Sequence, residues 1–150
     1  MLNSLPSAID LSQKRILLTG GSGFLGKHVL QQLQLLGVKP EQVRIPRSRT
    51  HDLRRWDVCQ EVVQGQDVVI HLAAHVGGIG LNQAKPAELF YDNLIMGSQL
   101  IHAAYLAGVE KFVCVGTICA YPKFTPVPFK EEDLWNGYPE AVSYTHLRAH

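Results

Sequence analysis

Three glycines near the start of the chain have the spacing of a phosphate-binding turn. Gly20, Gly23 and Gly26 lie in the segment TGGSGFLG, which follows a short apolar run and opens a helical pattern. In such turns the first glycine allows a tight reversal, the second lets the backbone approach a pyrophosphate, and the third lets the helix pack closely on the strand. We therefore predict a dinucleotide site with contacts from Gly20, Gly23, Phe24, Leu25 and Gly26. A glycine-rich turn without a ligand is the alternative.

The residues about 20 positions after the glycines indicate which dinucleotide is bound. NAD-binding folds usually carry a carboxylate there for the ribose 2′-hydroxyl, whereas this chain has the segment IPRSR, with Arg47 and Arg49. Guanidinium groups bind phosphate through paired hydrogen bonds. Arg47 or Arg49 is therefore predicted to bind the 2′-phosphate of NADP(H), although a solvated basic loop would have the same composition.

Several further segments resemble the extended short-chain dehydrogenase/reductases, and among them the GDP-L-fucose synthase family. The turn matches the T-G-x-x-G-F-x-G pattern of the larger group. HLAA, from residue 71, resembles the stretch that lines the cofactor there. The segments similar to the narrower family are VGGI from residue 76, YDN from residue 91 and GTICAYPKFTPVPF from residue 116. The resemblance covers about residues 14 to 141.

The resemblance implies an enzyme that uses NADPH on a GDP-sugar. Members of the family convert GDP-4-keto-6-deoxy-D-mannose to GDP-L-fucose by 3,5-epimerisation and 4-reduction. Thr117 occupies the position of the hydroxyl that bonds the C4 oxygen, and Cys119 that of the thiol that exchanges protons. Both roles are chemically sound, because a hydroxyl donor stabilises a developing alkoxide and a thiolate can remove a proton next to a ketone. Taken alone, Thr117 fits a strand-end hydroxyl and Cys119 a small buried hydrophobe.

The resemblance also assigns cofactor contacts outside the glycine turn. It places an Asp-Leu pair beside the adenine, an H-x-A-A strand end along the cofactor, and an asparagine that bonds the backbone of a neighbouring strand. In this chain these are Asp52, Leu53, Leu72, Ala73, Ala74 and Asn93. Asp52 also fits a simple turn aspartate, and Asn93 could face solvent. Residues 76–78 are expected to form a flexible loop near the sugar.

Two other functions remain open. One is an NAD-dependent sugar-nucleotide epimerase or dehydratase of the same superfamily, for which we expect an acidic residue near Arg47 and neither the VGGI loop nor Cys119. The other is a non-catalytic nucleotide-binding protein that keeps the fold but lacks the tyrosine and lysine with which enzymes of the resembled group carry out catalysis.

The predicted elements place these residues on a Rossmann-type, doubly wound parallel α/β sheet. Apolar runs alternate with helical patterns. Strands are predicted at 15–19, 42–46, 67–73 and 111–115, and helices at 24–36, 58–64 and 86–107. Asp57 is predicted to cap the second helix, and Gly37, Gly65 and Gly108 to end the three helices. Right-handed crossovers place the first strand at the sheet centre.

The composition is that of an ordinary globular protein. The chain has 150 residues, is 46% hydrophobic and carries a formal net charge of +1, so bulk charge favours neither a nucleic-acid nor a membrane partner. No apolar stretch is long enough to span a bilayer. The three cysteines are expected to be reduced in a cytoplasmic protein, with Cys59 and Cys114 as buried hydrophobes. No metal-site spacing is found, and His71 and His75 are expected to be satisfied polar residues.

The last residues depart from the family pattern. The family has a Tyr-x-x-x-Lys pair on the next helix, whereas Tyr144 is followed four residues later by Arg148. Residues 142–150 also resemble a translated sequencing adapter. We therefore expect an incomplete NADP-binding domain over residues 1–141, a non-native tail over 142–150, and a sheet truncated before its last strands and the substrate domain. Such a fragment is expected to be inactive, and the full-length protein is expected to be a homodimer.

Overall fold

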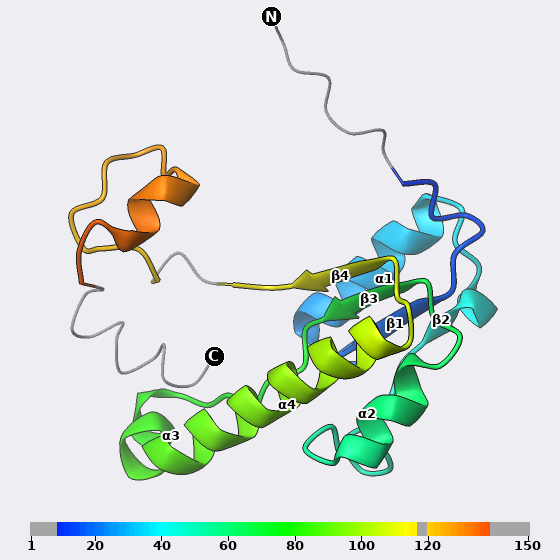
Figure 1. Ribbon diagram of the computed structural model, residues 1–150, viewed down its shortest axis with the longest axis horizontal. Coiled ribbons are helices and arrows are strands. Elements are labelled where there is room, and N and C mark those ends of the chain that lie inside the picture. The colour runs from blue at the N-terminus through cyan, green and yellow to red at the C-terminus, as the bar shows by residue number, and fades with distance from the viewer. Residues whose placement is uncertain (1–8, 117–119, 139–150) are drawn as a thin grey trace, which may run out of the picture.

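The computed structural model describes residues 9–116 and 120–138, apart from the Ile79 side chain, and contains one four-stranded sheet (Figure 1). The strands are parallel and lie in the order β2-β1-β3-β4. Their bounds are β1 (Ile16–Thr19), β2 (Val43–Arg44), β3 (Val68–His71) and β4 (Lys111–Cys114). The α-helices are α1 (Phe24–Leu35), α2 (Trp56–Val63), α3 (Ile79–Ala84) and α4 (Pro86–Leu106), and short 3-10 helices cover Pro40–Gln42 and Glu131–Trp135.

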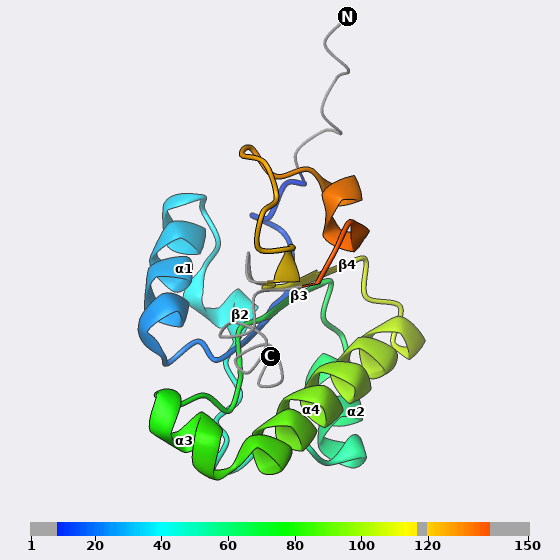
Figure 2. The same cartoon turned by 90° about the vertical axis from the view of Figure 1, so that its left-hand side faces the viewer.

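The helices cover both faces of the sheet. Figure 2 shows α1 on one side and α2 with α4 on the other. Successive side chains of a strand point to opposite faces, and both faces are apolar here, as in a buried parallel sheet. On the α1 face Ile16 and Val68 pack with Leu33, while on the other face Leu17 and Val69 pack with α2 and α4. The predicted doubly wound sheet with β1 inside it is therefore confirmed.

The entry ends of three strands are joined by backbone bonds that set the strand register. The Arg15 carbonyl accepts the N–H of Asp67 at 2.8 Å, and the Asp67 carbonyl accepts the N–H of Glu110 at 2.9 Å. The Asp67 carboxylate also accepts the Arg15 N–H at 2.7 Å. At the other end of the strands this register aligns Thr19 with His71 and His71 with Cys114.

Several predicted element bounds need correction. The second strand is only two residues long, because Pro40–Gln42 forms a 3-10 helix in which the Gln42 side chain accepts the Lys39 N–H. Asp57 does not cap α2: the helix begins two residues earlier than predicted, at Trp56, and Asp57 lies in its first turn, paired with Arg55 at 2.6 Å. Helix α3 was not predicted. The long helix was predicted to within one residue, and the three helix-ending glycines all have positive φ.

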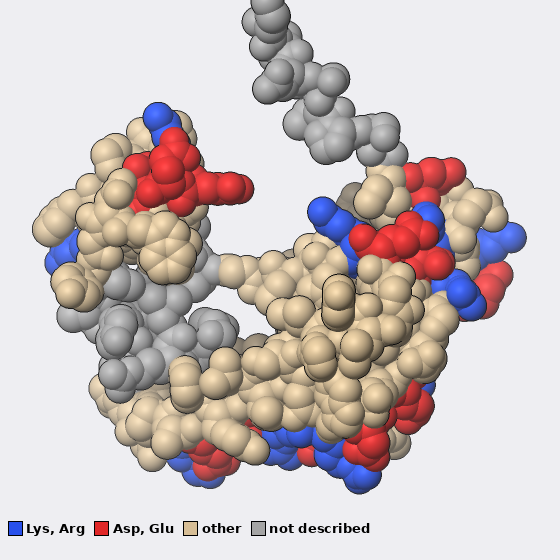
Figure 3. All heavy atoms as spheres, in the orientation of Figure 1, with Lys and Arg blue, Asp and Glu red and all other residues tan. Residues whose placement is uncertain are grey.

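The surface over α4 and β4 is largely uncharged. Figure 3 shows this area in tan, with Lys, Arg, Asp and Glu side chains along its lower rim and beside the strand entries. Helix α4 carries exposed large side chains, among them Tyr91, Leu94 and Tyr105. Within the described residues, no helix is both long and apolar enough to cross a membrane.

Candidate functional site

A cavity of about 590 Å³ lies at the carboxyl ends of β3 and β4. Open α/β sheets bind their ligands at this edge. The start of α1 and the middle of α4 form its two sides, and the segments that leave β3 and β4 form its floor. Its lining comprises Leu25, His71, Leu72, Ala73, Ala74, Val76, Asn93, Leu94, Gly97, Ser98, Ile101, Cys114, Val115 and Gly116. Four of the predicted cofactor contacts outside the glycine triplet, together with Leu25, therefore line one cavity.

The glycine turn is built from backbone atoms at close quarters. Gly20 has φ +70°, and a Cβ there would lie 2.8 Å from the Leu72 carbonyl carbon. A Cβ at Gly26 would overlap the Gly20 carbonyl oxygen and lie 2.5 Å from the Gly21 Cα. Positive φ and contact with backbone atoms both exclude larger residues. The first and third glycines therefore have the structural roles that their spacing predicts.

The turn leads into α1 with the start of the helix open. Gly23 is the N-cap residue, its backbone is extended, and among the described residues no side chain caps the helix. The first N–H groups of a helix have no partner within it, and the helix dipole adds partial positive charge there. Leu25 reaches the cavity, whereas the exposed Phe24 ring packs edge-on against the His28 ring, with 5.0 Å between the two ring centroids. The geometry is therefore suited to a phosphate group.

His71, which lines the cavity, is bonded to the fully buried Thr19. The Thr19 hydroxyl oxygen accepts the N–H groups of Leu72 and Ala73, each at 3.2 Å, and lies 2.7 Å from the His71 Nδ1. With two N–H groups already donated to this oxygen, the hydroxyl hydrogen goes to Nδ1, so the remaining ring proton is on Nε2. Burial lowers the pKa of His71, which keeps the ring neutral. The prediction that His71 is a satisfied polar residue is confirmed.

Asn93 holds the segment that follows β3. Its Oδ1 accepts the His75 N–H at 2.7 Å, and its Nδ2 donates to the His75 carbonyl at 2.9 Å and to the Leu89 carbonyl at 2.8 Å. Asn93 therefore bonds a neighbouring backbone rather than only facing solvent, but this backbone belongs to the segment after β3 and not to a strand as predicted.

Asp92, the preceding residue of α4, is a buried carboxylate with two cationic or polar neighbours. It is 4% exposed, lies 2.8 Å from the His75 Nδ1 and accepts the Arg54 Nη1 at 3.2 Å. Burial, the largest influence, acts to raise its pKa, but the bonds from His75 and Arg54 together outweigh burial, and the pKa is lowered. The carboxylate is therefore ionised, and the His75 Nδ1 donates to it.

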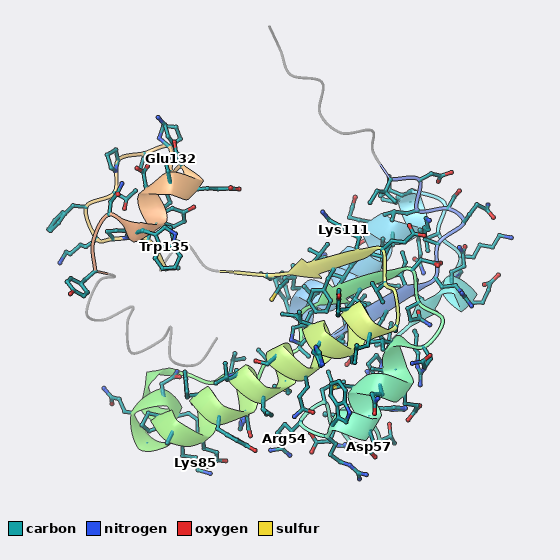
Figure 4. The ribbon with its side chains drawn as sticks, viewed as in Figure 1. Arg54, Asp57, Lys85, Lys111, Glu132 and Trp135 are labelled. Atoms are coloured by element: carbon teal, nitrogen blue, oxygen red, sulfur yellow. The ribbon has the colours of Figure 1, made fainter. Side chains whose placement is uncertain are left out.

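Arg54 comes from the turn before α2 and lies on the side where α2 approaches α4 (Figure 4). Its guanidinium also pairs with Asp52 at 2.8 Å, and Asp52 accepts the Arg54 backbone N–H at 3.0 Å. Asp52 thus forms the turn that its residue type predicts, and Leu53 is buried in the core. Sequence reasoning missed Arg54 because it lies 38 residues before its partner, Asp92.

The two arginines after β2 differ from the other described arginines. Arg15, Arg44, Arg54 and Arg55 each pair with a carboxylate. Arg47 and Arg49 are exposed and form no ion pair with any described residue. Ile45 packs beside the glycine turn, since a Cβ on Gly21 would lie 2.9 Å from its Cγ2. The two guanidinium groups, unpaired among the described residues, therefore come two and four residues after Ile45, which touches the turn.

The cysteines fall into three situations. Cys59 is buried as predicted, its thiol donates to the Leu53 carbonyl at 3.1 Å, and burial raises the pKa of this thiol to about 11. Cys114 was predicted to be buried, but this is wrong: it is exposed, because it ends the edge strand β4 and faces the cavity. Thr117 and Cys119 lie outside the described residues.

The VGGI segment leads directly into α3. Asn82 of that helix donates to the Gly77 carbonyl at 3.1 Å and to the Gly78 carbonyl at 3.2 Å.

Among the described residues, no three His, Cys, Asp or Glu side chains are grouped as metal ligands.

The chain is similar to proteins that bear GDP-sugar enzyme names. It is 32% identical over 142 residues to GDP-mannose 3,5-epimerase 1 of Oryza sativa subsp. japonica, and this alignment covers 84% of the chain and 38% of the relative. It is 33% identical over 129 residues to a GDP-L-fucose synthase of Sinorhizobium fredii, and this alignment covers 85% of the chain and 40% of the relative. The chain thus spans about two fifths of the length of these relatives.

A solved structure agrees with these matches. The crystal structure of a GDP-L-fucose synthetase from Naegleria fowleri bound to NADP superposes with a TM-score of 0.71 at 28% identity, over 91% of this chain and 41% of that one. The model of the NAD dependent epimerase/dehydratase family matches residues 16–146. With the glycine turn, the parallel sheet and the cavity at its carboxyl edge, this match shows that the chain belongs to the NAD dependent epimerase/dehydratase family.

Proposed function

We propose that the chain is the NADP(H)-binding part of a GDP-sugar epimerase–reductase similar to GDP-L-fucose synthase. The observation that carries the cofactor assignment is that Arg47 and Arg49 are exposed, form no ion pair with a described residue, and come shortly after Ile45, which packs on the glycine turn. The names of the relatives support a GDP-sugar substrate.

The described residues fit the cofactor in two places. The open start of α1 would receive the pyrophosphate, because it offers N–H groups and partial positive charge without a side chain at Gly23. Arg47 and Arg49 would receive the 2′-phosphate, for which Arg is well suited because its planar group forms two parallel bonds. The cavity between α1 and α4 would then hold the nicotinamide, which supplies a hydride when bound.

Thr117 and Cys119 complete the proposal for the substrate side. They follow Val115 and Gly116, both of which line the cavity. The Thr117 hydroxyl would donate a hydrogen bond to the sugar C4 oxygen during reduction, and Cys119 would exchange protons at carbons next to the ketone. A cytoplasmic location and a homodimer for the whole protein stay predictions of the same resemblance.

A redox-neutral GDP-sugar 3,5-epimerase is the second candidate, favoured by the 32% identity to the rice protein of that name. The two candidates differ in net cofactor use. A reductase converts one NADPH to NADP for each product formed, whereas an epimerase leaves the cofactor total unchanged.

The cofactor assignment is tested by titrating the chain with NADPH and with NADH. Loss of charge-assisted bonds to the 2′-phosphate costs about 1.5–3 kcal/mol, so we expect NADPH to bind about 10- to 100-fold more tightly than NADH. The double variant Arg47→Ala, Arg49→Ala should lose this preference. Arg55→Ala is the matched control, since Arg55 pairs with Asp57, and it should keep the preference. Equal affinity of the wild type for the two nucleotides would overturn the assignment.

A further inference from the structure

Asp92 joins two loops at the carboxyl edge of the sheet that have no bond to each other among the described residues. One is the turn that carries Asp52 and Arg54, before α2. The other is the segment that begins at His75, after β3. Asp92 accepts the Arg54 guanidinium at 3.2 Å and the His75 Nδ1–H at 2.8 Å, so a single carboxylate bonds both loops.

In addition to their bonds with Asp92, the two loops are held by different contacts. Arg54 has a second carboxylate partner in Asp52, and its carbonyl accepts the Gln99 side chain at 3.2 Å. The His75 backbone is held at both its N–H and its carbonyl by Asn93. Asp92 and Asn93 are neighbours on α4, so together they fix the side chain and the backbone of His75.

This arrangement lies directly behind the cavity wall. Ala74, Val76 and Asn93 line the cavity, and His75 lies between the first two in the chain. A change in the position of Asp92 would therefore move the wall, although Asp92 itself does not line the cavity. The charge of this carboxylate is balanced by the Arg54 guanidinium, whose side chain is 48% exposed and thus accessible to a ligand on the surface.

We propose that Asp92 is a positioning residue that couples the Asp52–Arg54 turn to the segment 75–78, so that nucleotide contact at the turn orders the cavity wall. The nucleotide part rests on the proposed function, in which the Asp52–Leu53 turn lies beside the adenine. Contact at the turn restrains Arg54, Arg54 restrains the Asp92 carboxylate, and the carboxylate restrains the His75 ring and the glycines that follow it.

Amide hydrogen exchange of the chain without nucleotide tests the coupling. The probes are the His75 N–H, which bonds Asn93, and the Leu81 N–H, which bonds the Gly78 carbonyl. Arg54→Gln should speed exchange at these probes by about tenfold, while Asp67 and Val68, at the entry of β3, change by less than about threefold. The matched control is Arg55→Gln, which removes the neighbouring guanidinium and its pair with Asp57 and should change neither set.

A double-variant comparison shows whether the effect passes through Asp92. In an Asp92→Asn background, adding Arg54→Gln should speed exchange at His75 no further. The proposal is overturned if Arg54→Gln leaves the His75 probe unchanged, or if it speeds the β3 amides equally, as a loss of global stability would. Arg54→Lys, which keeps the charge and loses the fork, should give an intermediate rate and serves if the Gln variant does not fold.

A second arm adds NADPH at a concentration that saturates binding. Wild-type exchange at His75 should slow further by about threefold or more, and Arg54→Gln should lose this extra protection although NADPH still binds. Saturating NADPH without added protection in the wild type would overturn the nucleotide part of the proposal. If NADPH does not bind at all, the proposed function fails, whereas the nucleotide-free comparison still decides the coupling.

Discussion

Two segments at the same edge of the sheet are held in different ways. In the glycine turn, residues 20–26, Gly20 and Gly26 lie so close to backbone atoms that a Cβ would not fit at either position. The segment 75–78 is fixed by side chains of two helices, through the Asp92 carboxylate and the Asn93 amide of α4 and through the bonds of Asn82 of α3. The first segment is tightly packed because Gly20 and Gly26 lack side chains, and the second is positioned because particular side chains are present. Substitutions should therefore disturb the glycine turn through steric overlap and the segment 75–78 through lost hydrogen bonds and charge.

The largest effect is expected from Gly26→Ala. The new Cβ would meet the Gly20 carbonyl oxygen and Gly21 backbone atoms, which cannot move without shifting β1 or α1. We expect the free energy of unfolding to fall by about 3 kcal/mol, the upper part of the usual range for overpacking, in urea denaturation followed by circular dichroism.

Gly97→Ala is the control for this substitution. Gly97 lies inside α4, and nothing lies within 4 Å of its Cβ position. Because alanine is the better helix former, the variant should gain about 0.5–1 kcal/mol. Equal losses for Gly26→Ala and Gly97→Ala would show that the tight backbone contact is not what holds the turn.

A smaller, pH-dependent effect is expected from Asp92→Asn. The pKa of Asp92 is lowered in the folded chain from 3.8, so its stabilisation is complete above the unfolded pKa and is lost as the pH falls through the folded one. At pH 7 the variant should lose about 1–2 kcal/mol, less than for a fully buried pair because Arg54 and His75 are 48% and 40% exposed.

This difference should shrink as the pH is lowered below about 4, where the protonated carboxyl resembles an amide. Denaturant unfolding of both proteins at pH 7, 5, 4 and 3 measures it. A gap that stays constant across this range would mean that the charge of Asp92 does not stabilise the segment.

The smallest effect is expected from chemical labelling, which compares an exposed thiol at the cavity with a buried thiol of α2 and does not depend on a change in stability. The Cys114 thiol is exposed at the cavity, while Cys59 is fully buried and its pKa is raised to about 11. Brief treatment with iodoacetamide at pH 8 should alkylate Cys114 and leave Cys59 unmodified until denaturant is added, as measured by peptide mass mapping. Early labelling of Cys59 would contradict the closed packing of α2 on the sheet.

The difference between the two segments also explains how much could be predicted from the sequence. The glycine turn depends on residues that are close in the chain, and the four strands and three longer helices depend on local periodicity, so these were predicted in the right order, whereas the short helix α3 was not. The Arg54–Asp92–His75 arrangement joins residues from three elements, and no local pattern specifies it. Asn93 was identified only through a resemblance, since its residue type alone fits a solvent-facing position equally well.

Burial was harder to predict than element type. Cys114 lies in an apolar strand, which suggested a buried residue, but β4 is at the edge of the described sheet and its carboxyl end opens into the cavity. The second strand was overestimated because Val43 and Ile45 have the right alternation, while the bonds of the Gln42 side chain favour a 3-10 helix just before it.

The strand order also has a consequence for how the chain folds. Ile16 pairs with Val43 and Val68, and Val68 pairs with Lys111, so each sheet contact joins residues that are far apart in sequence. Such non-local pairing slows folding, because the entropy of closing long loops is lost before the contacts form. During synthesis β1 emerges first, and it cannot pair with β3, its neighbour toward β4, until β3 has been made. The glycine turn, although local in sequence, can therefore reach its final geometry only after Leu72 and Ala73 have docked against Gly20.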